Sequence, residues 1–242
     1  MEQNKLIAIV AVYNAIYDGK NYIKMCLDSI AAQTYKNYEV VVLDDCSTDG
    51  TWETINEYPF HKLRNPVHNC RGFYNQLQAM WYLPLDGEAV YMIIDGDDHL
   101  VDNKVFEDVN NMYQNGVLLT YGKFNALSGS YGEFGSPDIN TKTYRRTGNW
   151  VTSHLKTFKR KLFTRIADAD LRYEDGEYYK ILGDATMMYP MIEMAGKDHI
   201  RCADRVLYVY NDMHPPGDHY PIFKKEIRHL RHKRCYPRMI WK

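Results

Sequence analysis

The chain has 242 residues, of which 45% are hydrophobic and 25% are charged, and its formal net charge is −1. This size allows one large α/β domain or two small ones, and the near-neutral charge excludes a general attraction to nucleic acid or anionic lipid, so such contacts would need a local patch. The five cysteines include no Cys-x-x-Cys pair, which argues against both a disulfide framework and a zinc site.

The first half of the chain alternates apolar runs with segments of helical periodicity. Runs rich in β-branched residues predict buried strands at 6–12, 39–43 and 89–94. Apolar residues at helical spacing predict helices at 20–33, 47–58 and 72–82. This order implies mostly parallel strands joined by right-handed crossovers, in a nucleotide-binding type of α/β sheet that binds ligands beyond the carboxyl ends of its strands.

The second half gives weaker signals. Residues 128–148 are rich in Ser, Gly, Asn, Thr and Pro, which predicts a mobile loop. Apolar spacing predicts helices at 150–166 and 178–195, and the pattern of 205–210 is typical of a strand. We interpret the loop as part of one domain rather than as a linker between two.

An acidic cluster, Asp95-Gly96-Asp97-Asp98, ends the apolar run at 89–94. Carboxylates this close repel one another unless a cation compensates their charge. Hard cations such as Mn²⁺ and Mg²⁺ prefer oxygen ligands and complete their shell with phosphate oxygens, so the cluster indicates a metal-bound phosphate ester; the alternative is a solvated acidic turn. Asn14 and Asp44-Asp45 also follow strands, so we expect these polar groups to converge on one crevice.

Four ordered motifs occur together in the first half: Val12-Tyr13-Asn14, Cys26-Leu27-Asp28-Ser29-Ile30 with Gln33-Thr34-Tyr35, the run from Val42 to Thr51, and the acidic cluster. With weaker likeness over 145–215, they resemble glycosyltransferase family 2, the inverting enzymes of the GT-A fold. The resemblance implies a Rossmann-like, mixed but mostly parallel sheet flanked by helices. It also implies transfer of a sugar from a nucleotide-diphosphate donor, a UDP-sugar, to an acceptor hydroxyl with inversion.

The resemblance further implies a division of the chain. Residues 1–215 would form the GT-A catalytic domain, with a nucleotide-sugar-binding half at 1–125 and an acceptor-side half at 126–215. The remaining residues, 216–242, lie outside the resemblance and form a basic C-terminal tail.

For the donor, the resemblance implies a base pocket and contacts to ribose and phosphate. Asp45 would accept the imide N–H of uracil, and the backbone of Val12, Tyr13 and Asn14 would line the pocket. Asp95 and the adjoining Gly96 would contact the ribose side, and Arg71 a phosphate or the base; a solvated loop arginine is the alternative for Arg71. For Asp44 we favour capping of the helix that begins near Ser47 over direct ligand contact.

The resemblance implies that Asp97 binds the metal, Mn²⁺ or Mg²⁺. The metal would in turn bridge the two phosphates of the donor. The cation would neutralise charge on the departing diphosphate. His214 follows the strand expected at 205–210 and would be a second ligand or a diphosphate contact, with His219 behind it. Asp98 would lie behind the metal ligands or face the acceptor.

Inverting transfer needs a general base for the acceptor hydroxyl. The resemblance nominates Asp184, at the start of the helix expected at 178–195, where Gly183 replaces the glutamate common in the family. Asp184 would otherwise only cap that helix, and Glu174 or Asp175 would then be the base. His154 would contact the sugar or a phosphate; the alternative is a structural histidine.

The acceptor is left open by the sequence: a glycan, a lipid-linked sugar, a protein, or DNA with hydroxylated bases as in some phage enzymes. The tail segment 222–242 is rich in Lys and Arg with interleaved apolar residues, which favours either contact with an anionic surface or a helix docked on the domain. Apolar runs fall short of the roughly 18 residues that span a bilayer, and the N-terminal residues lack a signal-peptide pattern. We expect a cytoplasmic protein, with peripheral attachment to a membrane surface as an option.

Two other functions compete with glycosyl transfer. A sugar nucleotidyltransferase shares the order of strands and helices, but needs a glycine-rich basic loop after the first strand, which Tyr13-Asn14-Ala15-Ile16 does not provide. A non-catalytic nucleotide-sugar-binding module would keep Asp45 and Asp95 without a working base, and an activity assay separates the two.

Overall fold

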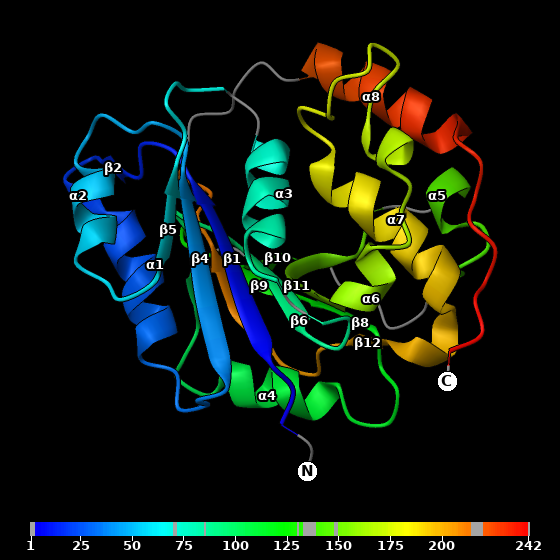
Figure 1. Ribbon diagram of the computed structural model, residues 1–242, viewed down its shortest axis with the longest axis horizontal. Helices are drawn as coiled ribbons and strands as arrows, with labels where there is room; N and C mark the ends of the chain where they lie inside the picture. Colours follow the sequence, from blue (N-terminus) through cyan, green and yellow to red (C-terminus); the bar gives the residue numbers. More distant parts are fainter. Residues whose placement is uncertain are drawn as a thin grey trace.

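A seven-stranded sheet runs through the centre of the molecule (Figure 1). The computed structural model describes residues 3–69, 72–84, 86–129, 131–132, 139–147, 150–213 and 220–241. The strands of the large sheet, in chain order, are β1 (Leu6–Val12), β4 (Tyr38–Asp44), β5 (His61–Arg64), β6 (Val90–Asp95), β8 (Leu119–Gly122), β11 (Ser153–Lys159) and β12 (Ile200–Cys202). Their order across the sheet is β12-β8-β11-β6-β1-β4-β5, and of these described strands only β11 runs antiparallel to its neighbours.

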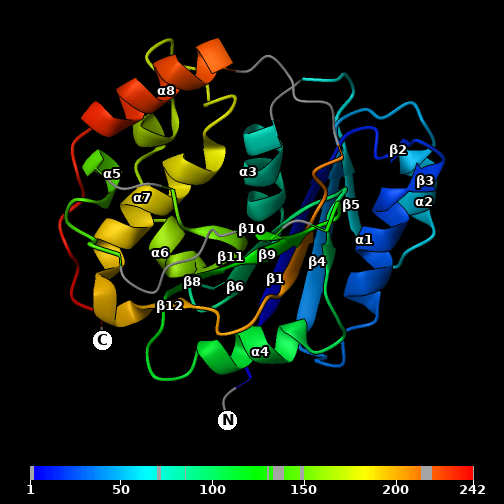
Figure 2. The ribbon, with the colours of Figure 1, turned by 180° about the vertical axis from the view of Figure 1, so that it is seen from behind.

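Helices cover both faces of this sheet (Figures 1 and 2). They are α1 (Tyr22–Ala31), α2 (Thr51–Asn56), α3 (Gly72–Tyr82), α4 (Val105–Met112), α5 (Tyr144–Thr147), α6 (Arg160–Phe163), α7 (Gly183–Ala195) and α8 (Tyr220–His232), with 3₁₀ turns at Asp168–Leu171 and Lys197–His199. One face packs on α3 and α7, and the other on α1, α2 and α4. The architecture is therefore α/β with a mostly parallel sheet between helices, as the sequence predicted.

Two smaller sheets complete the fold. A four-stranded sheet has the order β10-β9-β13-β7, and a hairpin pairs β2 with β3. Their bounds are β2 (Ile16–Tyr17), β3 (Lys20–Asn21), β7 (His99–Leu100), β9 (Phe124–Ala126), β10 (Tyr131–Gly132) and β13 (Tyr208–Tyr210). The small sheet brings β13 beneath the acidic cluster, because the Tyr208 hydroxyl accepts the backbone N–H of Asp95 at 2.9 Å.

Alternation along β1 explains why it is buried on both faces. Ile7 and Ile9 pack toward α3 and α7, whereas Leu6, Ala8 and Val10 pack toward α1 and α4, and all five side chains are fully buried. Each buried aliphatic side chain contributes about 1.5 to 3 kcal/mol of transfer free energy. In the strand register Val12 pairs with Asp44 and Ala11 with Asp95, so the carboxyl ends of three strands lie level with one another.

The helix predicted at 150–166 is wrong over most of its length. Residues Ser153–Lys159 form β11, inserted between β6 and β8, and only Arg160–Phe163 are helical. The β-branched Thr157 bonds the hydroxyls of Tyr113 and Thr120 at 2.7 and 2.6 Å, which suits a strand buried on both faces. Strand pairing with two neighbours therefore outweighs the apolar spacing that suggested a helix.

The helix predicted at 178–195 begins five residues later than expected, at Gly183. The buried carboxylate of Glu226, in α8, accepts the backbone N–H groups of Lys180, Ile181 and Leu182 at 2.8 to 3.0 Å. The carboxylate thus serves N–H groups that lack an acceptor within α7, whose first turn is closed by the bond from the Thr186 N–H to the carbonyl of Leu182 at 2.9 Å. The last helix of the chain thus determines where α7 starts.

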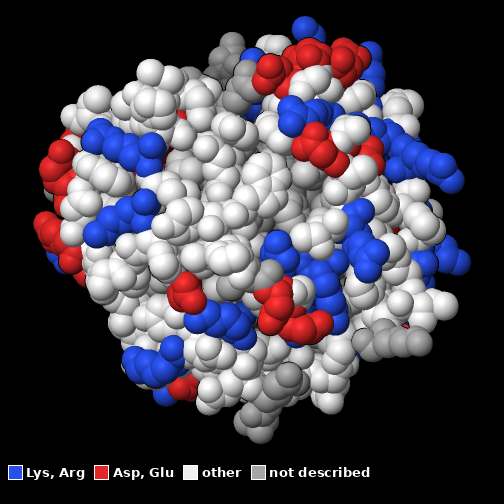
Figure 3. Space-filling model, in the orientation of Figure 1, with Lys and Arg blue, Asp and Glu red and all other residues white. Residues whose placement is uncertain are grey.

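The basic C-terminal segment is docked on the domain along its described residues, 220–241. Leu230 is fully buried, and the backbone N–H of Met239 and the indole N–H of Trp241 both donate to the carbonyl of Met194 in α7. Acidic residues lie among its cationic side chains, because Glu174 and Asp175 line one hollow together with Lys224, Lys225 and Arg228. Figure 3 shows acidic and basic side chains side by side in the region where Figure 1 labels α8. Within the described chain, we find no helix with both the length and the apolar character needed to cross a membrane.

Candidate functional site

The polar residues that follow β1, β4 and β6 lie together at one edge of the sheet. A cavity of about 160 Å³ is lined by Val12, Tyr13, Asp45 and Asp95, together with residues of α3. The backbone N–H of Asp45 donates to the carbonyl of Val12 at 2.9 Å, which fixes the end of β4 against the end of β1. The structure therefore brings together these four residues of the predicted donor site.

Gly96 allows the acidic turn to pack closely against the end of β1. A Cβ atom at this position would lie 2.4 Å from the Cβ of Val12, and the Gly96 N–H donates to the carbonyl of Ala11 at 3.0 Å. No side chain fits between the turn and β1. The glycine between the carboxylates thus lets the acidic cluster approach the end of β1.

Asp45 is almost completely buried and is surrounded by donors. One carboxylate oxygen accepts the amide of Asn65 at 2.6 Å, and the other lies 2.8 Å from Nδ1 of His68. The backbone N–H of Asn69 is 3.3 Å from both oxygens. Asn65 and His68 lie after β5 and were missed by the sequence analysis, because they lie in a segment without recognisable periodicity.

Asn14 and Asp44 hold the neighbouring loop. The Asn14 side chain accepts the N–H of Thr48 at 2.9 Å, and its own N–H donates to the Ser47 hydroxyl at 2.8 Å. Both oxygens of the buried Asp44 accept the N–H of Ser47 at 3.2 Å, as expected for a carboxylate that caps this turn, and Oδ2 also pairs with Arg64. The Asp44 side chain therefore holds the loop at Ser47 and does not line the cavity.

The acidic cluster contributes to a group of three possible metal ligands, Asp95, Asp98 and His154, whose ligand atoms all lie within 4.8 Å of one another. Asp98 is buried, and its Oδ1 accepts the N–H of Asn211 at 2.7 Å, whereas Oδ2 has no hydrogen-bond partner among the described residues. Burial, followed by the charges of Asp95 and Asp97, raises the pKa of Asp98 to about 9. A cation at this point would relieve both the repulsion and the unpaired oxygen.

His154 is suited to join such a site. Burial, followed by the charge of Lys156, lowers the pKa of the imidazole, which stacks on Tyr208 with ring centres 4.7 Å apart. A neutral imidazole offers a lone pair to a metal. In this structure the Lys156 ammonium donates to Nε2 at 2.8 Å, so a cation that binds there would replace that hydrogen bond.

This trio differs from the predicted pair of Asp97 and His214. Asp97 is half-buried beside the trio and does not belong to it, and its assignment as a metal ligand stays a prediction. His214, like His219 and Arg71, lies outside the described residues. The sequence analysis treated Asp98 and His154 as secondary, because their approach depends on the strand at 153–159, which it did not predict.

Asp184 lies in the first turn of α7 and forms an ion pair with Lys156, whose side chain is only 2% exposed. Lys156 also reaches His154, and Nε2 of His154 is 3.5 Å from a carboxylate oxygen of Asp95. A chain of four polar side chains thus joins the metal-ligand group to Asp184. Asp184 makes no side-chain cap to the backbone of its helix, so its capping alternative has no support here.

Gly183, next to Asp184, has no room for a side chain. A Cβ atom there would lie 2.4 Å from the Cβ of Phe73 in α3. This contact explains why a glycine occupies the position where the family commonly has glutamate. The fallback bases, Glu174 and Asp175, line the hollow beside α8 described above and not the cavity at Asp45 and Asp95.

A groove of about 460 Å³ opens beside Asp184. Its walls are mostly apolar and aromatic, and Arg231 of α8 adds a cation: the lining includes Trp150, Leu182, Tyr189, Phe223 and Ile227. Such a surface suits the apolar part of a ligand better than a highly charged polymer.

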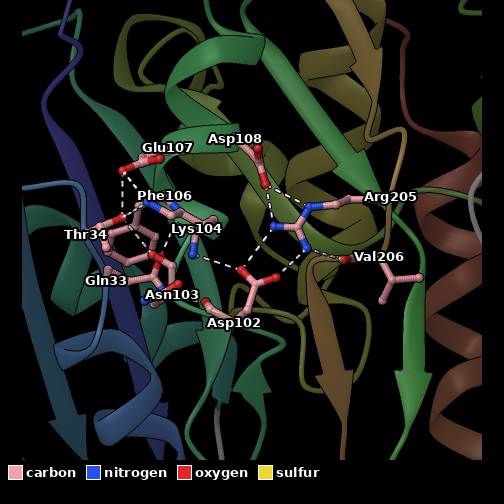
Figure 4. A network of polar contacts seen from close by, with 10 residues as sticks. All are labelled: Gln33, Thr34, Asp102, Asn103, Lys104, Phe106, Glu107, Asp108, Arg205 and Val206. Atoms are coloured by element: carbon pink, nitrogen blue, oxygen red, sulfur yellow. Dashed lines mark hydrogen bonds and ion pairs between the residues drawn. The ribbon is translucent and has the colours of Figure 1, made fainter.

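The Gln33-Thr34 motif holds the loop that follows the acidic cluster (Figure 4). The Gln33 side chain accepts the N–H of Phe106 at 2.9 Å and donates to the carbonyl of Asp102 at 2.6 Å. On the other side of the loop, Arg205 binds Asp102 and Asp108. This motif therefore stabilises the fold near the site without contacting the site itself.

Comparison with known proteins identifies relatives of the chain. The model of the family described as Glycosyl transferase family 2 matches residues 7–173. The Escherichia coli protein "UDP-Glc:alpha-D-GlcNAc-diphosphoundecaprenol beta-1,3-glucosyltransferase WfaP" is 28% identical over 117 residues, which are 48% of this chain and 46% of WfaP. The chain thus spans about half the length of this curated relative.

Solved structures share the fold at lower sequence identity. S. aureus TarS 1-349 has a TM-score of 0.66 and 20% identity, covering 91% of this chain and 63% of that chain, and TarS has also been solved with UDP and with UDP-GlcNAc. The mannosyltransferase PcManGT from Pyrobaculum calidifontis, in complex with GDP-Man and Mn2+, has a TM-score of 0.55 and 18% identity, covering 95% of this chain and 62% of that chain. These likenesses confirm the expected GT-A type of fold, and because the family model matches well over half of its residues, the chain belongs to glycosyltransferase family 2.

Proposed function

We propose that the protein transfers a sugar from a UDP-sugar to an acceptor hydroxyl with inversion of the anomeric carbon. The observation that carries the proposal is the chain of side chains from Asp95 through His154 and Lys156 to Asp184, which links a donor-side carboxylate to a carboxylate that faces an open groove. Donor and acceptor chemistry would then take place at neighbouring points of one site.

On the donor side, Asp45 would accept the imide N–H of uracil while Tyr13 stacks on the base. Tyr13 is 43% exposed at the mouth of the cavity, and Asp45 lies at its wall. Asp95 would bind the ribose hydroxyls above Gly96, and the backbone from Val12 to Asn14 would border the base. The UDP and UDP-GlcNAc complexes of TarS support a uridine nucleotide as the donor class.

The residues present fit a divalent metal, Mn²⁺ or Mg²⁺. Asp95, Asp98 and the neutral His154 would hold it, because their ligand atoms converge and one oxygen of Asp98 lacks a partner among described residues. When bound, the cation would neutralise negative charge on the diphosphate leaving group. The Mn2+ in the PcManGT complex supports this type of cofactor.

On the acceptor side, Asp184 would act as the general base. The acceptor oxygen attacks the anomeric carbon, its proton passes to the Asp184 carboxylate, and the bond between that carbon and the diphosphate oxygen breaks with its electrons on the diphosphate. Lys156 positions the carboxylate, since its nearly buried ammonium bonds Asp184 from the inner side.

The groove beside Asp184 bears on the choice of acceptor. Its aromatic and aliphatic walls favour an acceptor with an apolar part, such as a lipid-linked sugar, and the GlcNAc-diphosphoundecaprenol in the name of WfaP is of this class. The acids among the lysines and arginines of α8 argue against a broad contact with DNA. A non-catalytic binding module would not require Asp184 at the end of the series of polar side chains that begins at Asp95.

The donor half of the proposal is tested by ligand-dependent thermal stability. UDP is expected to raise the melting temperature in the presence of Mn²⁺ or Mg²⁺ and to have little effect with chelator, because the diphosphate reaches the carboxylates through the metal. Equal stabilisation with and without chelator would contradict the metal role. Release of sugar from a panel of nucleotide sugars, measured with and without metal, then identifies the donor.

A further inference from the structure

The imidazole of His68 lies flat against the ring of Tyr13. The ring centres are 3.6 Å apart and the planes are inclined by 13°, which is face-to-face stacking. At the same time Nδ1 of His68 lies 2.8 Å from a carboxylate oxygen of the buried Asp45. One small aromatic ring therefore uses both groups that the proposed donor site offers to a nucleobase.

Uracil would make the same two interactions. It is a flat ring that stacks on an aromatic side chain, and its imide N–H donates to a carboxylate. With the imidazole in place, the remaining cavity is only about 160 Å³, below the 300 to 1,000 Å³ typical of sites for small ligands. The imidazole thus takes up the place against Tyr13 and Asp45 that a uracil ring would need.

The segment that carries His68 is held to the site by polar contacts rather than by apolar packing. It connects β5 to α3, and Asn65 and Asn69 both donate to the side-chain oxygen of Asn75 at 2.9 Å. His68 itself keeps 32% of its side chain exposed, so its outer side faces solvent rather than the core. Release of the imidazole would break its stacking on Tyr13 and its bond to Asp45 without opening the hydrophobic core.

We propose that His68 is a stand-in for the nucleobase: it occupies the base site of the free protein, and the donor displaces it. This inference rests on the proposed function, since it takes Tyr13 and Asp45 as the base site. A site that is filled part of the time binds with an apparent dissociation constant equal to the intrinsic one divided by the open fraction. Removal of the imidazole should therefore strengthen donor binding.

The test is calorimetric titration of UDP, with Mn²⁺ present, into the wild-type protein, His68→Ala and His61→Ala. We expect His68→Ala to bind UDP about 3 to 10 times more tightly, as for a site closed most of the time. His61 is the matched control, because it precedes the same segment and pairs with Glu39 on the surface. Pyrophosphate, which has no base, should bind all three proteins equally.

The outcomes separate this inference from the proposed function. Equal or weaker binding of UDP by His68→Ala, with normal binding by the wild type, overturns the inference and leaves the donor site standing. Failure of all three proteins to bind UDP contradicts the proposed donor, and the inference with it. A gain for pyrophosphate as large as the gain for UDP would also overturn it, because the effect would not concern the base.

A second measurement follows the ring of His68 in the unaltered protein by proton NMR, with a variant used only to assign the resonances. The ring protons of His68, assigned by their loss in His68→Ala, should resonate upfield in the free protein because they lie over the face of Tyr13. Saturation with UDP and Mg²⁺, which is diamagnetic and leaves the proton resonances sharp, should move them toward the values of an exposed histidine. Resonances that stay upfield in the complex would show that the ring is not displaced.

Discussion

Asp184 and Lys156 form an ion pair in which the two partners differ in environment. The ammonium is almost fully buried, whereas the carboxylate keeps 36% of its side chain exposed toward the groove. A carboxylate fixed from one side and open on the other is placed to receive a proton from an incoming hydroxyl. The same pair would be an unusual choice for a purely structural contact, since it leaves a buried charge dependent on an exposed partner.

Asp184→Asn is expected to lower turnover about 10² to 10⁴ fold while UDP affinity stays unchanged. An asparagine fills the same space but cannot take the proton, and the proposed base faces the acceptor rather than the nucleotide. Turnover and calorimetric UDP affinity are measured together, with Asp175→Asn as the control. Near-normal turnover of Asp184→Asn would remove it as the base, and a loss confined to Asp175→Asn would transfer the role there.

Some residues of the site could be predicted from sequence and others could not. Asp45 and Asp95 follow apolar runs whose identity as strands is unambiguous, so the geometry of a parallel sheet places them at one edge. Lys156 and His154 meet within β11, where the ammonium lies 2.8 Å from Nε2, and this becomes visible only when the segment is recognised as a strand. His68 gave no signal, because its position depends on contacts between distant parts of the chain.

At the scale of elements, the packing of α7 against α3 depends on a single glycine. Gly183→Ala is expected to destabilise the protein by about 1 to 3 kcal/mol, because the new methyl group would overlap Phe73, although alanine is the better helix former. The matched control is Gly72→Ala, which also changes the first residue of a helix but has open space around it. Urea unfolding measures both; equal stability of the two variants would contradict the predicted overlap.

The loop after the acidic cluster is held by Arg205, which binds Asp102 and Asp108 (Figure 4). Arg205→Gln is expected to cost about 0.5 kcal/mol at neutral pH, since both partners are partly exposed and screened by solvent. The hydrogen bond from Arg205 lowers the pKa of Asp102, so its contribution is present above the unfolded-state pKa of about 4 and is lost as the pH falls through the folded-state value.

The difference in melting temperature between the wild type and Arg205→Gln should therefore be largest near pH 7 and should shrink in acid. Arg165→Gln, an exposed arginine elsewhere, serves as the control and should match the wild type throughout. A difference that persists unchanged at pH 3 would mean that Arg205 stabilises the loop by packing and not by its charge.

An element could be predicted from the sequence when its own residues carry the pattern that defines it. β1, β4 and β6 are apolar on both faces and need no knowledge of the rest of the fold. β11 carries the polar residue Thr157, whose hydroxyl bonds those of Thr120 in β8 and of Tyr113 after α4, so its strand character depends on partners far away in sequence. The start of α7 was misplaced for a related reason, because its limit is a carboxylate more than forty residues later.

At the scale of the whole molecule, α8 stabilises the start of α7 through Glu226, which accepts the N–H groups of residues 180–182. Glu226→Gln is expected to reduce stability by about 1 to 3 kcal/mol, because three backbone N–H groups lose a charged acceptor in a buried position. The neighbouring Lys225→Ala removes an exposed side chain and should change stability by less than about 0.5 kcal/mol. Guanidinium unfolding compares the two, and an unaltered midpoint for Glu226→Gln would show that water replaces the carboxylate.

The capping of residues 180–182 by Glu226 also sets an order of events during synthesis. A chain emerging from the ribosome exposes β1, β4 and β6 first, and their apolar faces allow the nucleotide-binding edge to assemble early. The turn before Asp184 cannot take its final form until α8 has emerged, because its N–H groups bond the carboxylate of that helix. A nascent chain would therefore acquire the carboxylates proposed to bind the donor before the proposed base is positioned, so sugar transfer would require that α8 has folded onto the rest of the domain.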